Sequence, residues 1–285
     1  MGTKARVPAV AGQFYNADPG RLRRQIDELI DRDRQKNDCI AALSPHAGFM
    51  YSGPVAGAVY SSINIPENVL LIGPNHTGRG ARASIMTEGI WRIPFGEMSI
   101  NGELATMLAD QSDLLEVDSA AHVYEHSLEV QLPFIYTFRP EVRIVPITLM
   151  GLSLEECDEL GRCIAGIISS YEEAVLIIAS SDMSHYVSDE TARKLDREAI
   201  KRLLDIDPEG LYDVVKRKGI SMCGYIPATV MLYAARYMEA GEAALIKYTT
   251  SAETSGDYDH VVGYAGVLVG STWEGSLKDV TPDTM

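Results

Sequence analysis

Three runs of apolar residues constrain the fold of this 285-residue chain more than any other feature of its sequence. The runs are CIAALS at 39–44, VLLIG at 69–73 and AVLIIAS at 174–180, and none of them alternates between apolar and polar residues. A short continuous apolar run is typical of a strand that is buried on both faces, as in the parallel sheets of α/β proteins. We therefore predict a central, mostly parallel or mixed sheet with helices on both faces.

The segments between these runs carry helical patterns, which support the α/β assignment. Asn101 is the expected N-cap of one helix, and Ser153 with Glu156 forms a capping box at the start of another. The last two strands are the ones that we expect to be antiparallel. Helices are predicted at 20–34, 54–62, 101–111, 125–137, 152–171, 189–205, 208–218 and 225–239, and further strands at 82–93, 143–150, 243–250 and 261–269.

The chain shows no repeat, no low-complexity tract and no change of composition that would mark a domain boundary. We therefore predict a single domain over residues 1–285, with about 271–285 as a flexible tail. A sheet with exposed edge strands can dimerise, but no segment of the sequence specifies an oligomeric state.

Charge and hydropathy exclude several classes of partner. The formal net charge is −15, whereas proteins that bind nucleic acid or anionic membranes neutralise phosphates with Lys and Arg. The apolar runs are far shorter than the roughly 18 residues of a membrane span. The N-terminal segment MGTKARVPAVAGQFY lacks the apolar core of a signal peptide. We expect a soluble cytoplasmic protein with no nucleic-acid or membrane partner.

Each of the three apolar runs leads into a polar turn that contains a histidine: His46, His76 and His185. In open α/β sheets, ligands bind beyond the carboxyl ends of the strands, so we expect these histidines to share a site. Imidazole binds zinc, iron, copper and nickel. Asp182 lies three residues before His185, which allows it to orient an imidazole or to join the metal ligands. No Gly-rich phosphate loop and no G-x-S-x-G motif occurs, which argues against a nucleotide enzyme or a common serine hydrolase.

A second concentration of polar residues is the H-x-x-E-H pattern formed by His122, Glu125 and His126. On a helix, this spacing places both histidines on one face. The pattern also occurs in a class of zinc proteases, where the histidines bind zinc and the glutamate is the general base. Three interpretations stay open: a zinc hydrolase, a helix that contributes to the shared site, and a helix N-terminus whose polar residues pair locally.

The four cysteines show no C-x-x-C spacing, so neither a disulfide framework nor a redox pair is expected. Cys39 lies in an apolar run and is expected to be a core thiol, while Cys157 and Cys163 lie in a helical pattern. Cys223 differs, because the surrounding GISMCGYIP reads as an irregular loop between two helices. There it is either an ordinary buried thiol or a thiolate that joins two imidazoles at a zinc, copper or iron ion.

At these residues the sequence resembles the Memo family. The resemblance is carried in order by SPHAGFMYSG, GPNHTG, EHSLEVQLPF, SSDMSHY and MCGYIP, and it extends from RVPAVAGQFY near the N-terminus to GYAGVLVG near the C-terminus. Five separate motifs in the same order make the resemblance specific, and it covers nearly the whole chain. It implies one α/β domain similar to the class III non-haem iron extradiol dioxygenases.

The resemblance also implies the residues of a site. The histidines of S-P-H-A-G and P-N-H and the cysteine of M-C-G correspond to a metal pocket, which assigns His46, His76 and Cys223 as ligands of iron or copper, or of zinc. Asp182 and His185 would line the same pocket, and His126 would be an acid/base group or a substrate contact. His122 would stand nearby, and we expect a structural role for His260.

The implied function is a metal-dependent redox or dioxygenase-like activity on a small-molecule or peptide ligand. A cysteine stands where non-haem iron oxygenases commonly use a carboxylate, and a thiolate changes the metal preference and can itself be oxidised. Prokaryotic relatives are associated with a radical-SAM partner protein in the AmmeMemoRadiSam system. The alternatives are a non-catalytic binding module that uses the same pocket for a peptide or small molecule, and the zinc hydrolase based on H-x-x-E-H.

Overall fold

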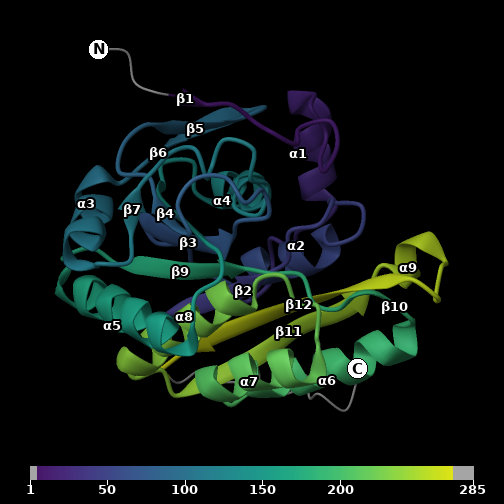
Figure 1. Ribbon diagram of the computed structural model, residues 1–285. Coiled ribbons are helices and arrows are strands. Elements are labelled where there is room, and N and C mark those ends of the chain that lie inside the picture. Colours follow the sequence, from purple (N-terminus) through teal and green to yellow (C-terminus); the bar gives the residue numbers. More distant parts are fainter. Residues whose placement is uncertain (1–4, 272–285) are drawn as a thin grey trace.

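The apolar strands form one mixed sheet at the centre of the computed structural model, which describes residues 5–271 (Figure 1). Most of the predicted tail at 271–285 lies outside the described residues. The sheet has nine strands, and its order is β10 (His185–Val187), β12 (Val261–Gly270), β2 (Ala41–Ser44), β9 (Val175–Ser180), β3 (Asn68–Pro74), β8 (Arg143–Leu149), β4 (Ala83–Ile85) and β7 (Glu116–Val117), with β11 (Glu242–Thr250) paired to β12.

The middle of this sheet is parallel. Strands β2, β9, β3 and β8 pair in parallel, while β12, β11 and β10 add an antiparallel side and β4 pairs antiparallel to β8. Every residue of β2, β3 and β9 is buried, because helices cover both faces. Since β2, β9 and β3 are parallel neighbours, their carboxyl ends meet at one edge of the sheet, and the loops that follow them lie side by side.

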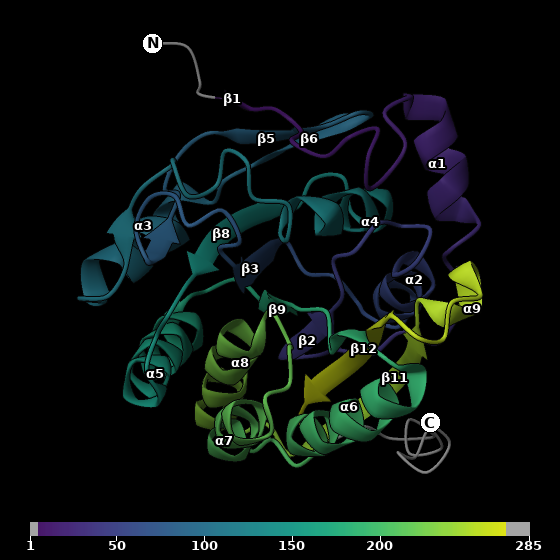
Figure 2. The same ribbon diagram turned by 45° about the vertical axis from the view of Figure 1, so that its right-hand side comes forward.

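Helices cover the sheet on both sides (Figure 2). Helix α8 packs on β2, β9, β3 and β8, and α2 packs on β2, β11 and β12. The predicted α/β class is confirmed. The helices are α1 (Pro19–Asp27), α2 (Gly53–Ser61), α3 (Gly102–Gln111), α4 (Leu132–Phe138), α5 (Leu154–Ser170), α6 (Asp189–Leu204), α7 (Pro208–Lys218), α8 (Tyr225–Tyr237) and the short α9 (Ala252–Ser255).

The predicted helix caps are confirmed. The Asn101 side chain accepts a hydrogen bond from the Leu104 N–H at the start of α3, and Ser153 forms the capping box with Glu156 at the start of α5. None of the helices within residues 5–271 has the length and apolar character needed to cross a bilayer.

A smaller sheet of β1 (Ala5–Arg6), β5 (Ile90–Ile93) and β6 (Gly96–Ser99) holds the start of the described chain. The segment that follows, residues 6–15, is here called the N-terminal strap. It is tied down by the buried Glu129 carboxylate, which accepts hydrogen bonds from the Arg6 side chain, the Ala9 and Val10 N–H groups and the Tyr15 hydroxyl. This buried carboxylate therefore has a partner for both of its oxygens.

Two predicted helices have different bounds. The helix predicted at 20–34 ends at Asp27, and the chain then turns so that the Leu29 carbonyl packs against Gly57, which has no side chain to block it. The helix predicted at 125–137 begins only at Leu132, after a 3-10 turn at Glu129–Gln131. Pro133 explains this difference, because proline fits the first turn of a helix and clashes in its interior.

The prediction that H-x-x-E-H lies on one helical face is therefore wrong. His122, Glu125 and His126 precede the 3-10 turn and belong to a loop without regular structure. The backbone of this loop is held by long-range contacts, since the Arg6 guanidinium donates to the carbonyl oxygens of His122 and Glu125.

Candidate metal centre

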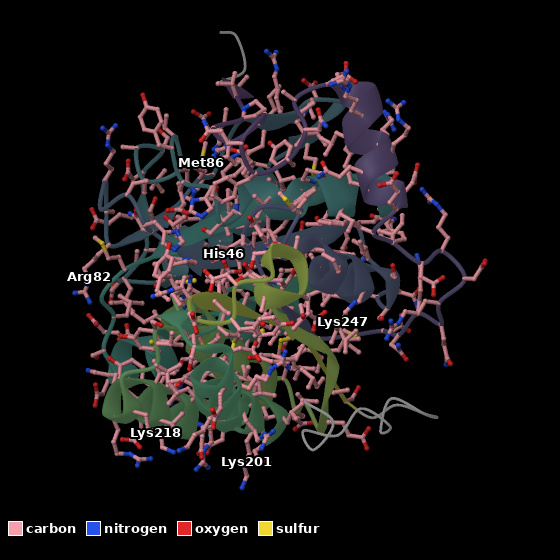
Figure 3. The ribbon with its side chains drawn as sticks, turned by 90° about the vertical axis from the view of Figure 1, so that its right-hand side faces the viewer. His46, Arg82, Met86, Lys201, Lys218 and Lys247 are labelled. Carbon is pink, nitrogen blue, oxygen red and sulfur yellow. The ribbon has the colours of Figure 1, made fainter. Side chains whose placement is uncertain are left out.

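His46 and His76 follow β2 and β3, and Cys223 lies two residues before the start of α8; the fold brings these three side chains together. Their ligand atoms all lie within 4.8 Å of one another. The His46 Nε2 atom is 3.2 Å from the Cys223 Sγ atom, and the two imidazole rings meet edge to face at 5.2 Å. His46 lies well inside the molecule (Figure 3), with 2% of its surface exposed. Two imidazoles and a thiol converging in this way fit a zinc, copper or iron ion.

The position of His46 is fixed through its backbone. The Asp182 Oδ1 atom accepts hydrogen bonds from the N–H groups of His46 and Ala47, at 2.7 and 3.3 Å. Burial raises the pKa of Asp182 to about 6, against the lowering effect of these hydrogen bonds. Asp182 thus joins the loop after β9 to the loop after β2. For the ring itself, burial and then the charges of neighbouring histidines hold the pKa of His46 well below its usual range, so the ring is neutral, as a metal ligand must be.

His76 is oriented by a buried carboxylate. Glu125 Oε1 is 2.9 Å from the His76 Nδ1 atom, and Glu125 Oε2 accepts the His76 N–H at 2.5 Å. A carboxylate that holds the second nitrogen of a metal-ligating histidine is a common arrangement in metal sites.

Glu125 could also be taken for a ligand, because its oxygen lies close to nitrogen atoms of His76 and His126. However, the carboxylate already accepts four hydrogen bonds, from the His76 ring and from the backbone N–H groups of His76, His126 and Ser127. Although burial alone would raise it, the hydrogen bond and charge of His76 and the Ser127 N–H lower the pKa of Glu125 to about 2. Glu125 therefore orients His76 and the backbone of its own loop, while its Oε2 atom, which accepts one of these four hydrogen bonds, keeps a lone pair.

Cys223 is positioned by a close approach of α8 to β9. Its neighbour Gly224 lies so near the Ser180 carbonyl that a Cβ atom there would be 2.3 Å from the oxygen. The Gly224 N–H donates to Ser181 Oγ, and the Asp182 N–H donates to Cys223 Sγ at 3.3 Å. Burial and then the charge of Asp182 raise the pKa of Cys223. A bound metal reverses this effect, because a coordinating thiol is deprotonated.

His126 packs against two of these three residues, and His185 is near enough for its charge to lower the pKa values of His46 and Asp182. The His126 ring stacks on that of His76 at 4.8 Å and is 5.5 Å from that of His46, while Phe14 of the N-terminal strap packs against it with the ring centroids 4.7 Å apart. Burial lowers the pKa of His126, although the charge of Glu125 opposes this. His185 is half-buried, and its Nδ1 atom is 2.9 Å from the Ser221 carbonyl oxygen.

The structure separates the remaining histidines from this group. His122 is fully buried, and its Nε2 atom is 3.0 Å from Ser84 Oγ. Within residues 5–271, His122 belongs to no group of converging ligand atoms, so the zinc hydrolase based on H-x-x-E-H loses its structural basis. His260 precedes β12, and its N–H donates to Asp257 in an exposed turn.

Three residues that support the ligands are not predicted from the sequence. Ser180 bonds the His46 ring, Gln131 bonds Ser180, and Phe14 packs against the His126 ring. Ser180 ends an apolar run and Gln131 follows the EHSLEV segment, so their polarity next to apolar residues was the available signal.

Known proteins are similar to this one along nearly the whole chain. A family profile described as "Memo-like protein" matches residues 6–268. A MEMO1 family protein of Methanopyrus kandleri is 40% identical over 277 residues, covering 92% of this chain and 98% of the relative. One of Sulfurisphaera tokodaii is 38% identical and covers 93% of this chain and 99% of the relative. Among solved structures, an uncharacterized protein of Escherichia coli K12 is similar in fold, with a TM-score of 0.51 at 11% identity, over 80% of this chain and 98% of that one.

Proposed function

The chain belongs to the Memo family, and from this membership and the geometry of the strand-end loops we propose that it binds iron or copper through His46, His76 and Cys223. The proposed activity is a metal-dependent redox or dioxygenase-like reaction on a small-molecule or peptide ligand. The likeness to class III extradiol dioxygenases stays a prediction from the resemblance.

One observation carries the proposal: three side chains from separate segments present two imidazoles and one thiol within 4.8 Å. The thiol is a soft ligand, which favours copper, iron or zinc over magnesium or calcium. Family membership and the four hydrogen bonds that Glu125 already accepts both favour this set over the group of His76, Glu125 and His126.

The chain's own residues would divide the remaining tasks. A bound metal would supply redox or Lewis-acid chemistry. His126, whose lowered pKa keeps it neutral, would accept or donate a proton beside the metal. His185 donates from Nδ1 to the Ser221 carbonyl, which can only accept, so its Nε2 atom is the nitrogen left to contact a ligand. Asp182 would hold the His46 loop, and the N-terminal strap would keep water from one side of His126 through Phe14.

The test is the metal content of protein purified without oxygen. We expect about one iron or copper ion per chain in the wild type and little in His46→Ala and Cys223→Ser. Cys163→Ser is the matched control, because Cys163 is a partly buried thiol on α5, and His122→Gln controls for loss of a histidine outside the group. Both controls should retain the metal.

Two results would contradict the proposal. If the wild type binds a ligand in this pocket but no metal, the protein is a binding module that does not use these residues as metal ligands. If zinc is retained by His46→Ala and lost from His122→Gln, the metal lies at the H-x-x-E-H segment.

A further inference from the structure

Two backbone carbonyl groups fix the direction of the hydrogen bonds behind His46, because a carbonyl oxygen can only accept. The Pro45 carbonyl is 2.9 Å from one side-chain atom of Gln131, and this atom must therefore be the amide nitrogen, Nε2. The other atom is then Oε1, which accepts the Tyr60 hydroxyl at 2.9 Å. Gln131 is fully buried, so bulk water does not compete for these two hydrogen bonds.

The second carbonyl, that of Ser127, fixes the hydroxyl group of Ser180. Ser180 Oγ is 2.7 Å from this oxygen and must donate its single hydrogen to it. Ser180 Oγ can then only accept from its other two partners, which are Gln131 Nε2 and His46 Nδ1, both at 2.9 Å. His46 Nδ1 therefore carries the hydrogen. The Nε2 atom, 3.2 Å from Cys223 Sγ, presents a lone pair.

His76 is fixed in the same way by a different group. Its Nδ1 atom faces Glu125 Oε1, and this carboxylate accepts three further N–H groups. An oxygen that accepts backbone N–H groups in this way has no hydrogen to give, so His76 Nδ1 also carries the hydrogen.

We propose that Ser180 and Glu125 are positioning residues that set the tautomers of two histidines before any metal binds. Ser180, which Gln131 and Tyr60 hold in place, sets His46 as the Nδ1–H tautomer, and Glu125 does the same for His76. Both Nε2 atoms are then ready as ligands. This inference deepens the proposed function, and its purpose rests on the proposed metal site. Residues that orient metal-ligating histidines in this way typically contribute about 10- to 100-fold to metal affinity.

Nuclear magnetic resonance of protein with ¹⁵N-labelled histidine, free of metal, tests the inference. Two-bond ¹⁵N–¹H correlations identify the nitrogen that carries the hydrogen in each ring, and we expect Nδ1 for His46 and His76 in the wild type. In Ser180→Ala, His46 loses its acceptor and gains by donating from Nε2 to Cys223 Sγ, so its Nε2–H tautomer should appear. Gln131→Met, which no longer holds Ser180, should shift His46 in the same direction.

The experiment contains its own controls. His76 depends on Glu125, so its tautomer should not change in Ser180→Ala or Gln131→Met, and its unchanged spectrum also reports that the variant is folded. Ser62→Ala removes another fully buried hydroxyl, which bonds the Ala58 carbonyl in α2, and should change neither ring. Metal affinity should fall about 10- to 100-fold in Ser180→Ala relative to Ser62→Ala.

The inference is overturned if His46 carries its hydrogen on Nε2 in the wild type, or if its tautomer is the same in Ser180→Ala. Failure of the proposed function gives a different result. In that case both rings are Nδ1–H tautomers and Ser180 controls His46, but the wild type binds neither iron nor copper.

Discussion

At the scale of single residues, His122 and His126 show that the surroundings of an imidazole determine its hydrogen bonds and its role. His126 faces His46 and His76, whereas His122 is enclosed beside Trp91 and Ser84. Ser84 donates its hydrogen to the Asp118 carbonyl, so His122 must donate from Nε2 to Ser84 Oγ. Burial, and then the charge of Arg6, lower the pKa of His122 to about 4. His122 is therefore a neutral structural residue at pH 7.

This lowered pKa predicts part of the acid sensitivity of the fold. Between pH 6.5, the ordinary pKa, and about pH 4, unfolded chains protonate His122 and folded chains do not. The free energy of unfolding is thus fully retained above pH 6.5 and falls by up to about 3 kcal/mol as the pH drops through this window. In His122→Gln this fall should be smaller, as measured by urea unfolding at several pH values. An equal loss in both proteins would assign it to other groups.

At the scale of elements, the site depends on the contact between the end of β9 and the start of α8. Ser180 ends β9 and supports His46, and its carbonyl touches Gly224, which precedes α8. Cys223 is the next residue back along the chain. The spacing between strand and helix therefore sets the distance between the thiol and the His46 ring.

A methyl group at this contact should displace Cys223 and weaken metal binding. Gly224→Ala places a Cβ atom 2.3 Å from the Ser180 carbonyl oxygen, so α8 and Cys223 must move. We expect metal affinity to fall at least about 10-fold, as for loss of a supporting residue. Gly166→Ala is the matched control, because nothing lies within 4 Å of a Cβ atom there and alanine favours the helix by about 0.5–1 kcal/mol. Titration with Co²⁺ followed by absorption measures both, and equal affinities would contradict the expected displacement.

At the scale of the whole molecule, the sequence predicts the central sheet well, because a strand that is buried on both faces is a continuous run of apolar residues. The strands that precede His46, His76 and Asp182 are predicted for this reason, and so is their common edge, whereas the short strand β10 that begins at His185 is not. The loop at 122–128 was not predicted, because H-x-x-E-H fits a helix equally well by spacing. Its conformation depends on Arg6, more than 110 residues away, which a local pattern cannot report.

Metal binding should stabilise the whole fold, because the ligands come together only in the folded state. At a free metal concentration 100 times the dissociation constant, the stabilisation is about 2.7 kcal/mol. For a chain of this size we expect the melting temperature to rise by several degrees in the wild type and to stay constant in Cys223→Ser. A similar rise in both, measured by scanning calorimetry, would indicate that the metal binds elsewhere.

The contact between His46 and Cys223 joins residues 177 positions apart. Closing so long a loop costs entropy before the contact is made, so we expect this contact to form late in folding. A metal held there would hardly change the rate at which the protein folds and would slow its unfolding. The ion would thus determine the lifetime of each folded molecule, and not the time that the chain takes to fold.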